Sequence, residues 1–130
     1  NPPADRDIVF NELMIDWDEP VVLVEGVFDA IAAGGNAIPI LGSTLRERSR
    51  LFQAIAIHDT PVYIALDGDA EKKAEWIIKS MLKYDLEVLK VPIDEEDVSE
   101  MGTEEFKERL RESSPIKNEM YFFEKLLENI

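Results

Sequence analysis

Four short apolar runs alternate with longer amphipathic stretches along the chain. The runs are residues 21–24, 37–41, 61–66 and 86–91. The first, Val21 to Val24, is continuously apolar and rich in β-branched residues, which is typical of a strand buried on both faces. Helical spacing of apolar residues predicts helices over 27–33, 44–57 and 70–84. Strands that alternate with helices form βαβ units, so we expect a Rossmann-like α/β fold: a mainly parallel sheet of about four strands with helices on both faces.

The two ends of the chain differ from this alternating middle. Asn1-Pro2-Pro3 is typical of a linker, and apolar residues at helical spacing predict a short helix over 8–17. Towards the other end, a helix is expected to begin at Thr103 and to stop at Ser113-Ser114-Pro115, before a last amphipathic helix over 117–127. We therefore divide the chain into a linker with a short helix (1–20), a main domain (21–112) and a C-terminal helix (113–130).

The charge balance narrows the functions that this chain can have. It carries 28 acidic and 14 basic residues, a net charge of −14, which disfavours a free-standing nucleic-acid binder because Lys and Arg make the phosphate contacts. The absence of cysteine excludes disulfides and a cysteine-ligated zinc site, and the single His58 excludes a multi-histidine metal site. No signal peptide or membrane-spanning run is visible, so we expect a cytoplasmic protein without a membrane partner.

Carboxylates follow three of the four predicted strands. Glu25 follows the first strand, Asp67 and Asp69 the third, and Asp97 the fourth. Ligands of open parallel sheets bind beyond the carboxyl ends of the strands, and clustered carboxylates repel one another unless a cation lies between them. The pattern predicts a site for Mg²⁺, or Mn²⁺ in its place, because these ions take oxygen ligands. The alternatives are a polar turn that caps a helix for Asp67 and Asp69, a helix cap for Glu25, and a solvated charge run for Asp97.

Other residues near these strand exits would support the site. In extended chain the side chains of the two aspartates point the same way, and Gly68 between them leaves room for a sharp turn and a ligand. Asp29 lies four residues after Glu25 on the same helix face, as a further ligand or, as we prefer, a supporting group. Ser43, Lys72 and Lys73 are candidate phosphate contacts, with a helix cap and a solvated helix face as the alternatives. Three aromatic side chains fit helix core faces better than base-stacking positions: Phe52, Trp76 and Phe106.

The order of these elements resembles the Toprim family, which has Glu-Gly-x-x-Asp after its first strand and Asp-x-Asp after its third. Here the two motifs read Glu25-Gly26-Val27-Phe28-Asp29 and Asp67-Gly68-Asp69. Leu41-Gly42-Ser43-Thr44 is similar to a segment of bacterial and phage primases, and Pro92 to Gly102 to their further acidic element. The resemblance covers residues 21–112, is closer to phage than to cellular primases, and implies a Toprim fold in which Gly26 supports the site. Where cellular primases usually continue with Arg-Ala-Gly, this chain has Ala70-Glu71-Lys72-Lys73.

The resemblance implies a DNA primase, a DNA-directed RNA polymerase that makes RNA primers for DNA replication by two-metal nucleotidyl transfer. Glu25, Asp67 and Asp69 would be catalytic and, with Asp97, would bind Mg²⁺; whether Glu25 is a ligand or a general base stays open. The implied partners are nucleoside triphosphates, a single-stranded DNA template held through other domains, and a replicative helicase. The chain resembles an excised catalytic module, which we expect to be inactive alone. The alternatives are a Toprim nuclease or topoisomerase fragment, and a non-catalytic Toprim scaffold in recombination or repair.

Overall fold

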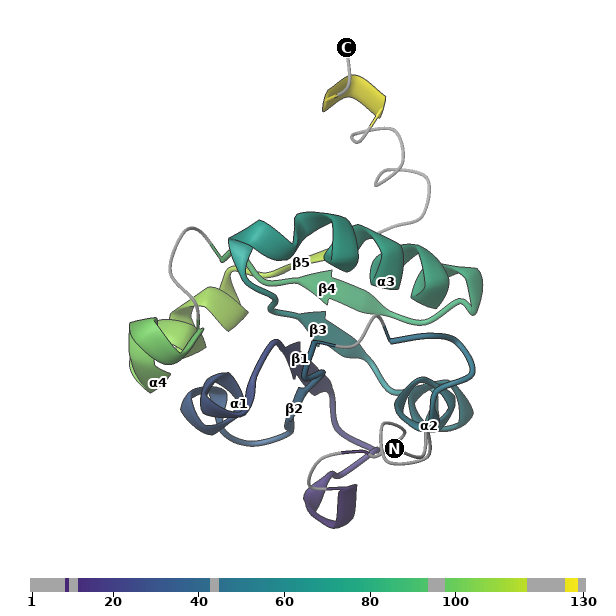
Figure 1. Ribbon diagram of the computed structural model, residues 1–130, viewed down its shortest axis with the longest axis horizontal. Helices are drawn as coiled ribbons and strands as arrows, with labels where there is room; N and C mark the ends of the chain where they lie inside the picture. Colours follow the sequence, from purple (N-terminus) through teal and green to yellow (C-terminus); the bar gives the residue numbers. More distant parts are fainter. Residues whose placement is uncertain (1–8, 10–11, 43–44, 94–97, 117–125, 129–130) are drawn as a thin grey trace.

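A five-stranded sheet forms the centre of the computed structural model, which describes residues 9, 12–42, 45–93, 98–116 and 126–128 (Figure 1). The strands are β1 (Val21–Val24), β2 (Ala37–Pro39), β3 (Val62–Ile64), β4 (Val88–Lys90) and β5 (Ser114–Ile116). The helices are α1 (Val27–Ala33), α2 (Arg50–His58), α3 (Glu71–Lys83) and α4 (Val98–Arg111), with two 3₁₀ turns, η2 (Glu12–Met14) and η3 (Gly68–Ala70).

The strands lie in the order β2-β1-β3-β4-β5, and all neighbouring pairs are parallel except β4 with β5. In this register Leu23 of β1 lies beside Ile38 of β2 and Ile64 of β3. The carboxyl ends of β1 and β3 are therefore neighbours at one edge of the sheet. The predicted Rossmann-like α/β class, with its mainly parallel sheet, is confirmed.

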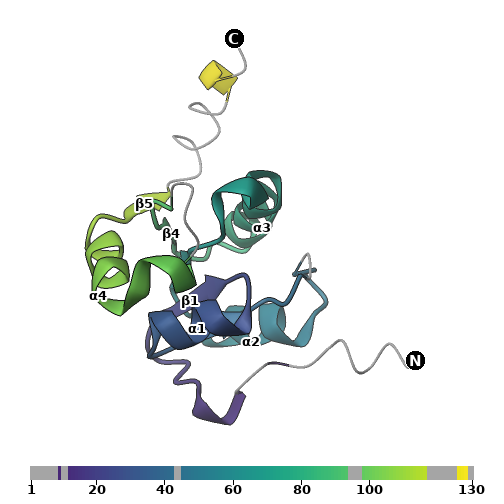
Figure 2. The same cartoon turned by 60° about the vertical axis from the view of Figure 1, so that its left-hand side comes forward.

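Helices cover both faces of the sheet (Figures 1 and 2). Leu23 packs towards α2 and α3, in a core cluster that contains Phe52 and Ile77. The next residue, Val24, packs in a second cluster with Phe106 of α4, because successive side chains of a strand point to opposite faces. Each fully buried aliphatic or aromatic side chain of this kind stabilises the fold by about 1.5–3 kcal/mol. Among the described residues, no helix has the length and apolar character needed to cross a membrane.

The fifth strand is the main departure from the expected fold. The sequence predicted a break at Ser113-Ser114-Pro115 and placed the end of the main domain at residue 112, whereas Ser114–Ile116 pairs antiparallel with β4 and extends the sheet. Pro115 is tolerated because β5 is an edge strand, where a residue without an N–H group does not interrupt a ladder on both sides. Most of the expected C-terminal helix lies outside the described residues; Leu126 to Glu128 are helical and exposed.

Three expected helix boundaries also change. The helix predicted to start at residue 44 begins at Arg50, because the Ser49 hydroxyl caps it by accepting a hydrogen bond from the Phe52 N–H at 3.2 Å. The helix expected over 8–17 is reduced, within the described residues, to the single turn Glu12–Met14. A helix was expected to begin at Thr103; a helical segment does begin there, after a kink at Gly102, but α4 as a whole starts at Val98.

The kink in α4 has a local cause. Gly102 has a φ of +83°, a left-handed conformation that glycine adopts without the steric cost of a side chain. Thr103, which the sequence suggested as a helix cap, donates its hydroxyl hydrogen bond to the Ala32 carbonyl at 2.8 Å. This contact joins α4 to α1 on one face of the sheet.

Candidate functional site

Glu25 is the first residue after β1, at the edge where the carboxyl ends of β1 and β3 meet. Its Oε1 accepts a hydrogen bond from Lys73 Nζ of α3 at 2.7 Å, and the two side chains are only 26% and 22% exposed. Its other oxygen, Oε2, is buried and has no hydrogen-bond partner among the described residues. Such an oxygen raises the free energy of the folded state unless it gains a donor or a cation. Glu25 therefore has one oxygen neutralised and one suited to a ligand.

Asp67 and Asp69 lie at the exit of β3, but not in the geometry that the sequence predicted. The Ala70 N–H donates to the Asp67 carbonyl at 2.9 Å and closes the turn Gly68–Ala70, so the segment is a 3₁₀ turn instead of extended chain. The two side chains consequently do not share a direction through strand alternation. Asp67 is half-buried at the start of the turn, and Asp69 is exposed within it.

These carboxylates do not form a ready-made metal cage. Among the described residues, no group of three or more His, Asp or Glu side chains is close enough together to hold a metal ion. Mg²⁺ does not need such a group, since it is commonly bound by one or two carboxylates, with water and substrate phosphates filling the remaining positions. The buried Oε2 of Glu25, which no donor in the described segments reaches, fits that kind of weakly held ion. Asp97, the fourth candidate ligand, lies outside the described residues.

Asp29 joins the first turns of two helices. Its side chain is 7% exposed, Oδ2 accepts from the Gly26 N–H at 3.0 Å, and Oδ1 accepts from the Ser99 N–H at 2.9 Å. Since both oxygens accept backbone hydrogen bonds, the geometry favours the supporting role over direct metal ligation. Gly26 has a φ of −131°, and an added Cβ would lie 3.6 Å from Asp29 Oδ2, an ordinary contact. Gly26 thus contributes its N–H group.

The two lysines of α3 take different positions. Lys73 turns to Glu25 and is not on a solvated face, whereas Lys72 is exposed. Ser43, the third candidate phosphate contact, lies outside the described residues. Both lysines line a cavity of about 710 Å³ whose other lining residues are Arg46, Glu47, Arg48 and Trp76.

The aromatic side of this cavity was not predicted from the sequence. Phe52 and Phe106 are fully buried, as predicted, but Trp76 is 49% exposed, so its assignment to the core was wrong. Its spacing carried a usable signal: the buried residues Ala74, Ile77, Ile78 and Met81 form one stripe on α3, and Trp76 lies outside it.

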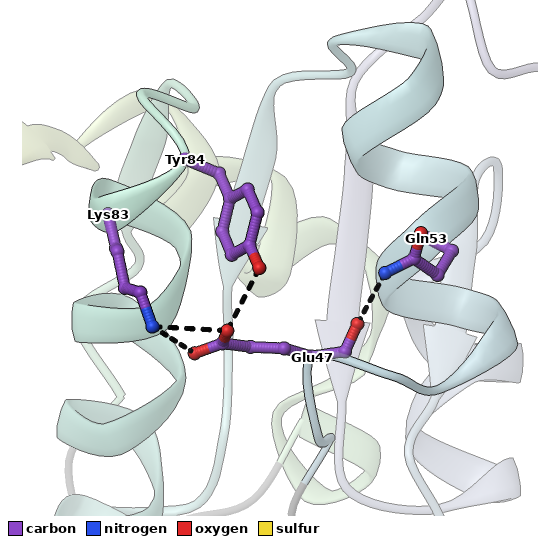
Figure 3. Close-up of polar contacts among 4 residues, drawn as sticks. All are labelled: Glu47, Gln53, Lys83 and Tyr84. Carbon is purple, nitrogen blue, oxygen red and sulfur yellow. Dashed lines mark hydrogen bonds and ion pairs between the residues drawn. The ribbon is translucent and has the colours of Figure 1, made fainter.

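Glu47 fastens the segment before α2 to the end of α3 (Figure 3). The Tyr84 hydroxyl donates to Glu47 Oε1 at 3.0 Å, and Lys83 Nζ lies 3.3 Å from both carboxylate oxygens. The Gln53 side-chain amide donates to the Glu47 carbonyl at 2.6 Å. The hydrogen bond from Tyr84, helped by Lys83, holds the pKa of Glu47 below its ordinary value, and the same hydrogen bond raises the pKa of Tyr84. Glu47 is therefore ionised at neutral pH, and its carboxylate is already bound by Tyr84 and Lys83.

The fold is similar to that of a solved bacterial primase from Aquifex aeolicus, a structure of its zinc-binding and RNA polymerase domains. The TM-score is 0.62 and the sequence identity is 28% over 75% of this chain. The chain spans only about a quarter of that protein, since the match covers 26% of the primase chain. No family model and no curated protein matches the sequence. The comparison supports a primase-like fold and a relation to primases.

Proposed function

We propose that this chain is the Mg²⁺-dependent Toprim module of a phage-type DNA primase, which serves nucleotidyl transfer in RNA primer synthesis. The observation that carries the proposal is the buried Oε2 of Glu25, which has no hydrogen-bond donor among the described residues and lies at the strand edge where Asp67 also emerges. The likeness to a bacterial primase at 28% identity supports it, because the same fold would place these carboxylates at the carboxyl ends of the same strands.

Each carboxylate would have a separate part in this site. Glu25 would hold the ion through Oε2 or act as a general base, and Asp67 and Asp69 would contribute oxygens from the next strand exit, with Asp97 as a further candidate. When bound, Mg²⁺ would stabilise charge on the transferring phosphoryl group and favour deprotonation of the attacking hydroxyl. Lys73 neutralises one oxygen of Glu25, which makes a carboxylate at this partly buried edge tolerable and keeps its side chain oriented.

The remaining parts of the reaction would come from elsewhere in a larger primase. With a net charge of −14, the chain is poorly suited to hold a template along its whole length, together with triphosphates, by itself. Nucleoside triphosphates, a single-stranded DNA template and a replicative helicase are thus proposed partners of the whole protein. The 130 residues alone would make no primers.

The tyrosines give no support to the alternative of a topoisomerase. Such an enzyme attacks with a tyrosine that normally lies on another domain. In the described part of this chain, Tyr63 lies within β3 and the Tyr84 hydroxyl donates to Glu47, and neither belongs to the acidic motifs. Tyr121 lies outside the described residues. The alternative of a non-catalytic scaffold is separated by metal binding, which a scaffold does not require.

Calorimetric titration with Mn²⁺ tests the proposed site. The wild-type chain should bind with a dissociation constant of roughly millimolar order, because few protein ligands are offered. Asp67→Asn combined with Asp69→Asn should abolish binding while the fold survives. The matched control is Glu104→Gln with Glu108→Gln, which removes two exposed charges from α4 and should leave binding unchanged. Full Mn²⁺ binding in the first variant, or its loss in the control, would contradict the assignment.

A further inference from the structure

A basic cavity with an aromatic side lies next to the candidate site. Its walls come from the segment that precedes α2 and from the first turns of α3, and its volume is about 710 Å³, within the range of small-molecule and nucleotide sites. Four of its six lining residues are basic and one is acidic; the lining consists of Arg46, Glu47, Arg48, Lys72, Lys73 and Trp76.

Three of the four basic side chains of this cavity are available to a ligand. Arg46, Arg48 and Lys72 are exposed, and none of them has a carboxylate partner among the described residues. The chain has twice as many acids as bases, so most bases could be paired. Three bases around one cavity that have no carboxylate partner in the described part of the chain therefore indicate an anionic ligand.

Glu47 does not neutralise these bases, although it lies between two of them in the sequence. Its carboxylate is held by Tyr84 and Lys83 at the far end of α3, as Figure 3 shows. This contact fixes the segment along α3. Arg46 and Arg48, the sequence neighbours of the anchored Glu47, both line the cavity. The anchor thus sets the positions of two cations relative to α3.

Trp76 supplies an apolar surface in the same cavity. It is 49% exposed on a helix whose stripe of buried residues packs into the core, so folding leaves about half of this indole in contact with water. A large aromatic side chain beside unpaired cations matches the way in which single-stranded nucleic acids bind, with a base stacked on the ring and phosphates on the basic groups.

We propose that this cavity binds a segment of single-stranded nucleic acid, with a base stacked on Trp76 and backbone phosphates contacted by Arg46, Arg48 and Lys72. A strand fits better than a single nucleotide because the three cations come from two separate elements, the segment before α2 and α3, that line the same cavity as the ring. Lys73 lines the cavity and also contacts Glu25, so a strand held here continues towards the carboxylate edge. In this respect the proposal rests on the proposed function, since it assigns the adjoining cavity to the template or primer strand.

The two indole N–H signals of ¹⁵N-labelled protein give a direct readout, because the chain contains only Trp17 and Trp76. Trp17→Phe assigns them. The protein is titrated at low salt, in the presence of EDTA, with an eight-residue oligothymidylate. The Trp76 signal should shift and the Trp17 signal should not. The logarithm of the binding constant should fall with the logarithm of salt concentration with a slope of about −2, as expected for three phosphate contacts on a single strand.

Matched variants separate the cavity from general charge effects. Trp76→Ala should weaken binding about tenfold, whereas Phe28→Ala, which removes an exposed aromatic ring from α1, should not. Arg46→Glu with Arg48→Glu should abolish the Trp76 shift. Lys107→Glu with Arg111→Glu makes the same change in net charge on α4 and should only weaken binding slightly.

Three results would overturn the proposal: no shift of the Trp76 signal at low salt, equal losses in the cavity variants and their controls, or binding of dTTP as tight as that of the oligonucleotide. The last result would assign the cavity to a free nucleotide. Since EDTA is present throughout, the outcome does not depend on the metal site. If the wild-type chain binds the strand but not Mn²⁺, the proposed function alone is contradicted. If it binds Mn²⁺ but not the strand, the proposal for this cavity alone is contradicted.

Discussion

Removal of the ion pair between Lys73 and Glu25 should have two opposite effects, on stability and on metal affinity. Lys73→Met removes the ammonium group that lies 2.7 Å from Glu25 Oε1 and keeps most of the aliphatic stem. The metal-free protein should lose stability, because a partly buried carboxylate is left without its cation. Its affinity for Mn²⁺ should rise, because the ammonium group no longer competes with the ion for Glu25.

The size of the stability loss follows from burial. Unit charges about 3 Å apart attract by roughly 5–6 kcal/mol at an effective dielectric constant of about 20, but desolvation of both groups cancels much of this. The two side chains are 22% and 26% exposed, so this ion pair is intermediate between two cases. An exposed pair is worth about 0–1 kcal/mol, and disruption of a buried pair costs about 3–5 kcal/mol. We expect a loss of about 1–3 kcal/mol, which lowers Tm by roughly 3–12 °C in a domain of this size.

Thermal unfolding with and without Mn²⁺, together with calorimetry, measures both effects. Lys107→Met is the control, since Lys107 forms an exposed pair with Glu104 at 3.6 Å and its loss should cost less than about 0.5 kcal/mol. The combined variant Glu25→Gln with Lys73→Met should recover part of the stability, because neither charge is then left alone. If Lys73→Met bound Mn²⁺ more weakly than the wild type, Lys73 would not compete with the ion and the reasoning would be refuted.

Two further predictions concern the anchor at Glu47 and the kink in α4. The pKa of Glu47 is lowered in the folded state, so its contribution to stability is present above the ordinary pKa of 4.5 and is lost as pH falls through the folded pKa. The pKa of Tyr84 is raised, so its contribution to stability is present below the ordinary pKa of about 10 and is lost as pH rises through the folded pKa. Tyr84→Phe should therefore move the pKa of Glu47 upwards in a carboxyl ¹³C NMR titration, and an unchanged value would show that the hydrogen bond is not its main cause. Gly102→Ala should cost about 1–2 kcal/mol in urea unfolding, because the φ of +83° suits glycine, whereas Gly26→Ala at −131° should cost clearly less; equal costs would contradict the conformational explanation.

The central strands and α1 could be predicted from the sequence because their signals are local. Val21 to Val24 is an uninterrupted apolar run in which three of four residues are β-branched, and the predicted bounds of α1 at 27–33 agree with the structure. The short strand β5 could not be predicted, since Ser114–Ile116 contains a proline and forms a strand only through its pairing with β4. The start of α2 was also misplaced, because several polar residues before it could have capped a helix, and Ser49 is the one that caps α2 in the structure.

The candidate site was predictable in its order but not in its contacts. Glu25 and Asp67 lie after neighbouring parallel strands, which the alternation of strands and helices implies. The contact between Glu25 and Lys73 joins residues 48 positions apart, and it depends on how α3 lies over the sheet. The geometry of Asp69 depends on a 3₁₀ turn that Asp-Gly-Asp does not specify by itself. The sequence therefore located the carboxylates, and the fold determined their partners.

The most direct test of the account is primer synthesis by an intact primase that carries Glu25→Gln, with the melting temperature measured on the same protein. The substitution keeps the size of the side chain and leaves Lys73 a neutral acceptor, so Tm should fall only slightly. Primer synthesis should fall by about a hundredfold or more, as expected when a charge-stabilising or acid–base group is lost from a reaction centre. A variant with full primer synthesis would contradict the account, because Glu25 would then serve the fold and not the reaction.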